Sequence, residues 1–386
     1  MNFKKSDKVW EWLDRQRMGF SDKKKENGSG LSDRTVAKYK YDFNRLMKLV
    51  ESETGKTDPM KVKPNDVYRI IDKMVGEYKA GKTANASFLR SIDDSLHAFK
   101  EASKASGVFK RELRLGDKKK IQETLNQEKV YRRASDTSVM KATREEVEKV
   151  VRELEKSTSP AKEVAIKALK LEFETGRRIS AILRSQVGNY DAKSGQYVTY
   201  GDKGGKDNES FFLTPGARGI LDSVTEDKKD GDMMFKIKYT QHRDPNKIGQ
   251  DKSVESMRKQ VSSLIQSAAK RAGVNRGELT FSSHSCRKGF ADERATFYIA
   301  TMTPEERREE LERRKSLDEN LSKRIDKVLE HIKSKFKIEG NAKNRDFTDT
   351  EITKLLVSTD INHSRIDVMR YYLMDYDFIQ KELFLK

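Results

Sequence analysis

The chain has 386 residues, which is enough for two or three domains with sizeable hydrophobic cores. Lys and Arg number 80 against 62 Asp and Glu, a formal net charge of +18 that favours a polyanionic partner, nucleic acid above all. The single cysteine excludes an intramolecular disulfide framework and favours a reducing, cytoplasmic location. No stretch approaches the roughly 18 apolar residues that span a bilayer, so we expect no membrane partner.

The N-terminal third predicts an arm, a small helical domain and a linker. Residues 1–30 carry basic runs and end in the Gly/Ser-rich sequence ENGSG, which is typical of a flexible joint and predicts a basic arm. Three amphipathic helical segments follow within residues 31–120, the first of them behind a Ser32 cap. Residues 121–139 lose the apolar period and gain charge, as a linker does.

Residues 140–386 predict a second, mainly helical domain. Thr143 precedes its first helix, and the Ser159-Pro160 pair separates that helix from the next. Further on, the sequence GQYVTYGDKGGKDNESFFLTP places two short strand-like runs around a Gly-rich turn and predicts a β-hairpin. Residues 303–337 predict a long charged helix with an apolar stripe only in its second half. The predicted fold class is therefore mainly α with a small β-sheet.

Four short segments of this second domain carry residues suited to phosphate chemistry: ETGRRISAIL, YGDKGGKDNE, HSCRKGFAD and INHSRIDVMRYY. Taken singly, each has an ordinary structural explanation, such as a solvated arginine or a packed histidine. In order they present an arginine, a lysine, a His-x-x-Arg box and a histidine followed nine positions later by a tyrosine. This succession resembles the tyrosine recombinase (phage integrase) family of DNA strand-exchange enzymes.

The resemblance implies a catalytic set, residue by residue. Its members come from four places in the sequence: the Thr-Gly-x-Arg-Ile-Ser segment, the hairpin turn, the His-x-x-Arg box and the Asn-His-Ser segment. The residues so implied are Arg178, Lys203, His284, Arg287, His363 and the nucleophile Tyr372. Lys206 competes with Lys203 for the lysine position, and Tyr371 competes with Tyr372, although neighbouring side chains on a helix point about 100° apart.

The chemistry of these residue types supports the same roles. Attack on a phosphodiester needs an in-line nucleophile and donors that take up charge on the non-bridging oxygens, which the forked guanidinium groups of Arg178 and Arg287 provide. A tyrosine hydroxyl ordinarily ionises near pH 10, so a cationic cluster must stabilise the developing phenolate. Lys203 is suited to protonate the leaving 5′-oxygen. His284 would assist proton transfer at the tyrosine, and His363 would bind the scissile phosphate. No metal or other cofactor is expected.

Three features depart from the family pattern. The family commonly has an acidic residue three positions after its first arginine, where this chain has Ala181, and Asn362 replaces the usual glycine before the second histidine. The interval between the His-x-x-Arg box and that histidine is also much longer than usual, because the helix predicted at 303–337 intervenes. The insertion either contacts a partner subunit or flanking DNA, or docks on its own domain.

The resemblance further implies a helical core-binding (SAM-like) domain and a catalytic domain that form a C-shaped clamp on DNA. The implied activity is site-specific recombination through a 3′-phosphotyrosyl intermediate, for integration, excision or resolution of a mobile element. The implied partners are double-stranded DNA with specific recombination sites, three further copies of the chain in a homotetramer on two duplexes, and an accessory directionality factor. The source would be bacterial or phage-encoded, and the protein nucleoid-associated. A telomere resolvase, a type IB topoisomerase-like enzyme and a non-cleaving DNA-binding protein are the alternatives.

Overall fold

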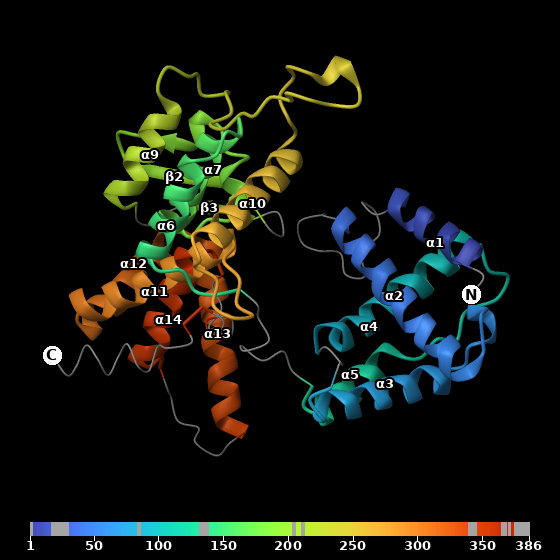
Figure 1. Ribbon diagram of the computed structural model, residues 1–386. Coiled ribbons are helices and arrows are strands. Elements are labelled where there is room, and N and C mark those ends of the chain that lie inside the picture. Colours follow the sequence, from blue (N-terminus) through green and yellow to red (C-terminus); the bar gives the residue numbers. More distant parts are fainter. Residues whose placement is uncertain are drawn as a thin grey trace. The chain divides into compact units, whose positions relative to one another are not determined.

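A computed structural model describes residues 3–16, 31–82, 86–130, 139–202, 206–209, 213–338, 346–363, 369 and 372–373. The chain divides into two compact units, residues 1–133 and residues 134–386 (Figure 1). Helices dominate both units, and the second unit also holds a small antiparallel sheet, as the sequence predicts. None of the helices in the described ranges combines the length and the apolar character needed to cross a bilayer.

The first unit is a helical bundle around an aromatic core. Its elements are α1 (Phe3–Gln16), α2 (Asp33–Thr54), the 3₁₀ turn η1 (Pro59–Lys61), α3 (Pro64–Lys79), α4 (Ala86–Ser106) and α5 (Lys118–Gln127). The Ser32 hydroxyl caps α2 by accepting a hydrogen bond from Thr35 N, which confirms the predicted start of that helix. In the core, Phe43 stacks on Phe99 with 3.8 Å between ring centroids. The ring centroid of Trp10 lies 5.3 Å from that of Phe99.

Two segments of this unit differ from the sequence prediction. Within the predicted arm, residues 3–16 form helix α1, because Val9 and Leu13 lie on one helical face with Trp10 and are buried in the core. Within the predicted linker, residues up to 127 belong to helix α5, whose Ile121 and Leu125 are buried in the core. In both segments a short apolar stripe inside a highly charged sequence is enough to attach a helix to the unit.

The second unit contains the sheet and nine described helices. Its elements before the insertion are α6 (Arg144–Glu155), α7 (Lys162–Thr175), α8 (Ile179–Ile182), η3 (Val187–Asn189), β1 (Tyr190–Asp191), β2 (Gln196–Asp202), β3 (Lys206–Glu209), α9 (Pro215–Thr225), η4 (Pro245–Lys247), α10 (Val254–Arg271) and α11 (Ser283–Thr301). Strands β2 and β3 pair antiparallel, which confirms the predicted hairpin, and β1 extends the sheet beside β2. Helix α7 packs against α6, α9, α10 and α11 and is the central helix of this unit.

The insertion forms two helices, where the sequence predicts one. Helices α12 (Pro304–Leu317) and α13 (Glu319–Ile338) meet at Asp318, whose extended backbone breaks the helix and whose carboxylate accepts a hydrogen bond from Leu321 N. Helix α14 (Asp349–Asp360) follows. The predicted apolar stripe starts at Leu317 and continues through Leu321 and Ile325. It is confirmed in part, since Leu321 and Ile325 are buried in one cluster with residues of α11 and α14, but Leu317 is 63% exposed. The insertion therefore docks on its own unit.

Candidate active site

The His-x-x-Arg box occupies the first turn of α11. Ser282 caps this helix with Ser285 in a reciprocal capping box. A Cβ on Gly289 would lie only 2.1 Å from the carbonyl oxygen of Ala142, so the glycine lets α11 approach the backbone before α6 closely. Arg287 is fully buried, while His284, one turn earlier, is exposed.

Arg287 joins three segments that are distant in sequence. Its guanidinium donates hydrogen bonds from Nη1 to the carbonyl of Gly176 and from Nη2 to the carbonyl of Ile361. Its Nε donates to Tyr372 Oη at 3.3 Å. Gly176 ends α7 in the left-handed conformation at φ 61°, and a Cβ there would lie 2.3 Å from the ring of Phe290. Gly176 is thus the C-cap of α7, and its carbonyl accepts a hydrogen bond from the arginine of the His-x-x-Arg box.

Glu172 is the site residue that the motif comparison misses. It lies on α7 and is 1% exposed, and Ile179 N donates a hydrogen bond to Glu172 Oε1 at 3.2 Å. Burial raises the pKa of this carboxyl well above its usual range, while the positive charges of Arg287 and Arg178 act in the opposite direction. Arg178 itself is half-buried at the start of α8. Both arginines of the predicted set therefore act electrostatically on Glu172.

Because burial raises the pKa of Glu172, its contribution to folding depends on pH. A carboxyl whose pKa is higher in the folded chain contributes stability that is complete below its unfolded value, about 4.3, and is lost as pH rises through the folded value. We therefore expect Glu172→Gln to gain in unfolding free energy relative to the wild type as pH is raised from about 4 to 8. Urea unfolding at several pH values measures this. Glu163→Gln, an exposed position on the same helix, should leave the difference flat, and a flat difference for Glu172→Gln would contradict the expectation.

The turn that carries His363 is a Schellman motif at the end of α14. His363 N donates to Ser358 O at 2.7 Å and Asn362 N donates to Thr359 O at 2.9 Å, the paired bonds that define this cap. Asn362 adopts a left-handed backbone with φ 55°. Asparagine tolerates that conformation better than other side-chain-bearing residues, so it can replace the glycine that the family uses there.

This conformation predicts an inverted order of stability for two substitutions. Glycine reaches positive φ without strain, whereas alanine pays about 1 kcal/mol there, so Asn362→Gly should be more stable than Asn362→Ala by about that amount. Chemical denaturation of the two variants measures the difference. The same pair at Lys354, within α14, should show the ordinary helical order, with alanine the more stable. Equal stabilities at position 362 would contradict the conformational explanation.

Tyr372 lies where these elements meet. Its side chain is 7% exposed, and its Oη is 3.3 Å from His363 Nε2 as well as 3.3 Å from Arg287 Nε. The ring of His284 approaches it edge-on, with 5.8 Å between centroids. A hydroxyl held between a guanidinium and an imidazole can lose its proton to the histidine side while the guanidinium stabilises the oxyanion.

Most of the predicted catalytic residues lie close together, and some of the candidates lie outside the described residues. His284, Arg287, His363 and Tyr372 are neighbours, and the positive charges of Arg178 and Arg287 both act on Glu172. Lys203 lies outside the described residues, as do Ser364 and Tyr371. Lys206 is the first residue of β3 and pairs with Asp202 in the hairpin.

Cys286 lies inside the His-x-x-Arg box but does not face solvent. Its thiol is fully buried, and burial, with the negative charge of Glu172, raises its pKa well above the ordinary value. Both effects disfavour the reactive thiolate. Cys286 is therefore a packing residue of the buried core.

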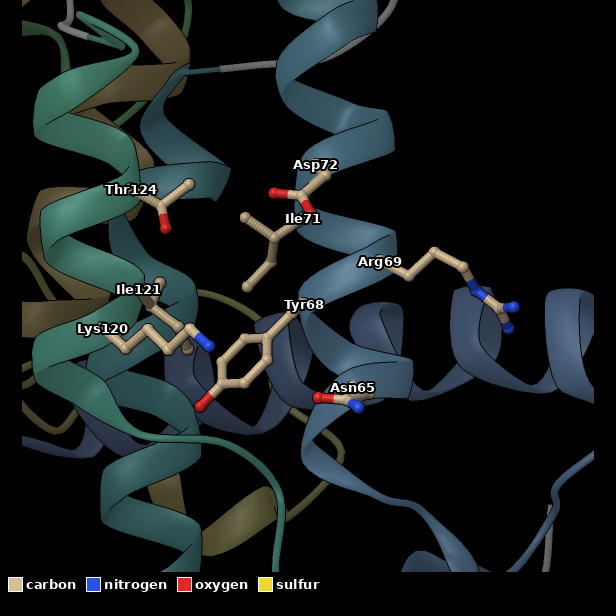
Figure 2. Close-up of a pocket in the computed structure, with 8 residues that line it drawn as sticks. All are labelled: Asn65, Tyr68, Arg69, Ile71, Asp72, Lys120, Ile121 and Thr124. Atoms are coloured by element: carbon tan, nitrogen blue, oxygen red, sulfur yellow. The ribbon is translucent and has the colours of Figure 1, made fainter.

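The first unit contains a pocket of its own. It has a volume of about 320 Å³ and lies between α3 and α5 (Figure 2). Lys120 Nζ lies 4.4 Å from the centroid of the Tyr68 ring, whose Oη accepts a hydrogen bond from Asp117 N. Arg69 and Asp72 add one charge of each sign to its lining. None of the six predicted catalytic residues lines this pocket.

No protein-family model matches this sequence, and no curated protein matches it significantly. Among solved structures, the XerA recombinase aligns over 98% of each chain, with 10% identity and a TM-score of 0.36. A lambda integrase tetramer bound to a Holliday junction aligns over 76% of this chain and 71% of its own, with 17% identity and a TM-score of 0.45. The Tn1549 transposon integrase in complex with transposon right end DNA aligns over 98% and 99%, with 12% identity and a TM-score of 0.44. These three solved structures are recombinases or integrases, and each resembles this chain at low identity and low TM-score.

Proposed function

We propose that this protein is a site-specific tyrosine recombinase that cuts and rejoins duplex DNA through a 3′-phosphotyrosyl intermediate. One observation carries the proposal: the Tyr372 hydroxyl lies 3.3 Å from both Arg287 Nε and His363 Nε2. These three residues come from the two most specific motifs of the sequence. A tyrosine hydroxyl held between Arg287, in the first turn of α11, and His363, just after α14, has the arrangement that a phosphoryl-transfer nucleophile needs.

In the proposed reaction, Tyr372 Oη attacks the scissile phosphorus and loses its proton, with His284 or His363 as the acceptor. The bond to the 5′-oxygen breaks, and a lysine of the β2–β3 hairpin, Lys203 or Lys206, protonates that oxygen. The products are a 3′-phosphotyrosyl link and a free 5′-hydroxyl. Arg178 and Arg287 bind the non-bridging oxygens. Attack by a 5′-hydroxyl from a partner duplex then reverses the step, so no outside energy source is needed.

The net charge of +18 supports DNA as the substrate, because each neutralised phosphate releases counterions. The reaction joins two duplexes with two cleavage points each, which requires four protomers, so we propose a homotetramer as the active assembly. Contact of both units with DNA in a C-shaped clamp remains a prediction, as does an accessory directionality factor. Whether the product is integration, excision or resolution depends on the DNA sites.

The test is a covalent-trapping assay. The full chain is incubated with nicked duplexes that carry its candidate recombination site, in the presence of EDTA, and the products are separated under denaturing conditions. A protein–DNA adduct is the expected result. A chain that binds the site but forms no adduct would be the non-cleaving DNA-binding protein of the same fold. Hairpin ends or relaxed circles, in place of exchanged strands, would identify a telomere resolvase or a type IB topoisomerase.

A further inference from the structure

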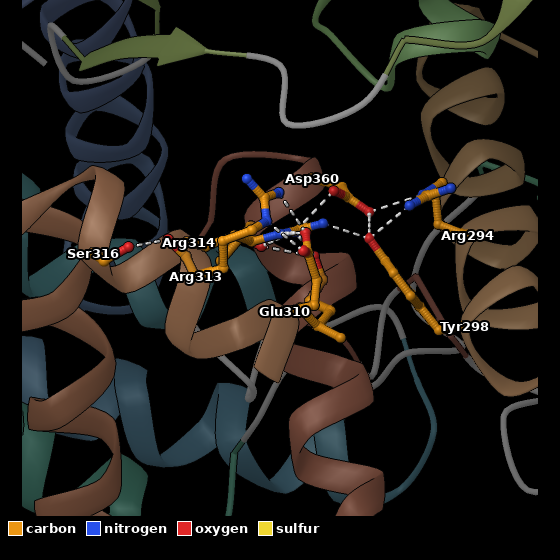
Figure 3. A network of polar contacts seen from close by, with 9 residues as sticks. Arg294, Tyr298, Glu310, Arg313, Arg314, Ser316 and Asp360 are labelled. Carbon is orange, nitrogen blue, oxygen red and sulfur yellow. Dashed lines mark hydrogen bonds and ion pairs between the residues drawn. The ribbon is translucent and has the colours of Figure 1, made fainter. Parts of the chain in front are cut away.

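A buried polar network connects the insertion to the turn that carries His363 (Figure 3). Its centre is Asp360, the last residue of α14, whose side chain is 3% exposed. From α11, Arg294 Nε donates to Asp360 Oδ2 at 2.9 Å and Tyr298 Oη donates to the same oxygen at 2.7 Å. These contacts attach one side of the α14 terminus to α11, the helix of the His-x-x-Arg box.

Arg314 enters the network from α12 of the insertion, and its side chain is 1% exposed. Its Nη1 lies 2.9 Å from Asp360 Oδ1 and also donates to the Leu356 carbonyl at 3.0 Å. The Thr359 hydroxyl accepts from the same nitrogen at 2.5 Å, and Nη2 donates to Tyr298 Oη at 2.6 Å. Arg314 therefore binds three groups in the last turn of α14: the Asp360 carboxylate, the Leu356 carbonyl and the Thr359 hydroxyl.

The last turn of α14, which Arg314 binds, leads directly into the proposed active site. Asp360 is followed by Ile361, whose carbonyl accepts a hydrogen bond from Arg287, and then by Asn362 and His363. A paired and fully hydrogen-bonded buried charge holds its neighbours in one arrangement, and cations at a helix C-terminus also interact favourably with the helix dipole. The position of His363 relative to Tyr372 thus depends on a contact made by the insertion.

We propose that the insertion is a positioning element of the active site, and that Arg314 is its key residue. Through Asp360 and the end of α14, Arg314 fixes the turn that presents His363 and the Ile361 carbonyl. This inference rests on the proposed strand-exchange function and assigns to residues 303–337 a part in it. Arg314 does not touch the reacting atoms, so it acts through the turn.

The chain offers a clean pair of variants. Arg314→Met leaves Asp360 paired with Arg294 and leaves Glu310 paired with Arg313, so neither carboxylate becomes a buried, uncompensated charge. Arg313→Met is the matched control, because Arg313 is the adjacent residue of α12, pairs with Glu310 and is 50% exposed. Arg314→Lys keeps the charge but lacks the fork that reaches several acceptors at once.

The first measurement is the single-turnover rate of adduct formation on a nicked substrate at saturating DNA, together with DNA affinity. We expect Arg314→Met to slow cleavage by about 10- to 100-fold, as a small misplacement of reacting groups does. DNA affinity should stay at the wild-type value. Arg313→Met should match the wild type in both, and Arg314→Lys should fall between. With His363→Ala already present, Arg314→Met should slow cleavage much less than it does alone, because both changes act on one element.

The second measurement does not depend on activity. Hydrogen exchange of the Asn362 and His363 amides should be about tenfold faster or more in Arg314→Met, while amides in α7 keep their protection. Should Arg314→Met fail to fold, as judged by near-UV circular dichroism, Arg314→Lys takes its place in both measurements.

A wild-type cleavage rate in folded Arg314→Met would overturn the inference. So would equal effects of Arg313→Met and Arg314→Met, or full additivity with His363→Ala. If the wild type forms no adduct at all, the proposed function fails, while unchanged exchange at Asn362 and His363 in Arg314→Met would separately refute the role of Arg314 in holding the turn.

Discussion

Replacing Tyr372 by phenylalanine is expected to abolish the covalent protein–DNA adduct. The substitution removes only the hydroxyl oxygen that lies between Arg287 and His363, while the ring keeps its packing in the cluster around α14. Without the nucleophile only background reaction remains, so the rate of adduct formation should fall by at least about 10³-fold. DNA affinity, measured on the same duplex, should not change, because the proposed phosphate donors stay in place.

Tyr371→Phe is the matched control, since it deletes the same atom from the preceding residue. It should form adduct at the wild-type rate. If only Tyr371→Phe loses the adduct, Tyr371 is the nucleophile instead of Tyr372. An adduct that survives both substitutions would place the nucleophile outside this segment and would contradict the proposed site.

Arg287→Lys is expected to have the next largest effect, although it preserves charge. Arg287 donates to the carbonyls of Gly176 and Ile361 and to the Tyr372 hydroxyl, and a lysine ammonium cannot reach acceptors so arranged. Loss of an aligned donor to a developing oxyanion costs about 10² to 10³ in rate, and we expect a decrease of that size in single-turnover cleavage. The variant should also be less stable to urea, because two buried carbonyls lose their donor.

Arg271→Lys makes the same change at a side chain that is 50% exposed and pairs with Glu153 on the surface of the second unit. It should leave both cleavage and stability near the wild type, since surface ion pairs contribute little. If Arg287→Lys cleaves DNA as fast as Arg271→Lys does, the fork of Arg287 has no part in the chemistry.

The sequence predicts the candidate site residues through short motifs and their order along the chain. His284 and Arg287, three positions apart, are neighbours on the helix that their segment forms. Glu172 was open to detection too, because it continues the apolar stripe of Ala165, Ala168 and Leu169, where a carboxylate is out of place. No such signal marks Arg314, which lies in a helix that is charged on every side. Its partner Asp360 is 46 positions away, and only the folded chain brings the two together.

In the fold, too, local sequence signals predict elements, whereas contacts between distant residues are not predicted. Ser32, Thr143 and the Gly-rich hairpin turn act locally, and the elements that they predict are present in the structure. The sequence predicts an arm and a linker where helix α1 and the last part of α5 lie, because charge dominates both segments. Their attachment depends on a few apolar residues that find partners in other helices, and composition does not reveal such partners.

The buried state of Cys286 makes this protein convenient for spectroscopy. It is the only thiol in the chain, and maleimide reagents require an accessible thiolate. A cysteine introduced at an exposed position, such as Lys119 on α5 or Glu319 on α13, would therefore take up a fluorophore selectively in the native protein. Labels placed this way in the two units would report the distance between them as DNA is added, without any need to remove the native residue.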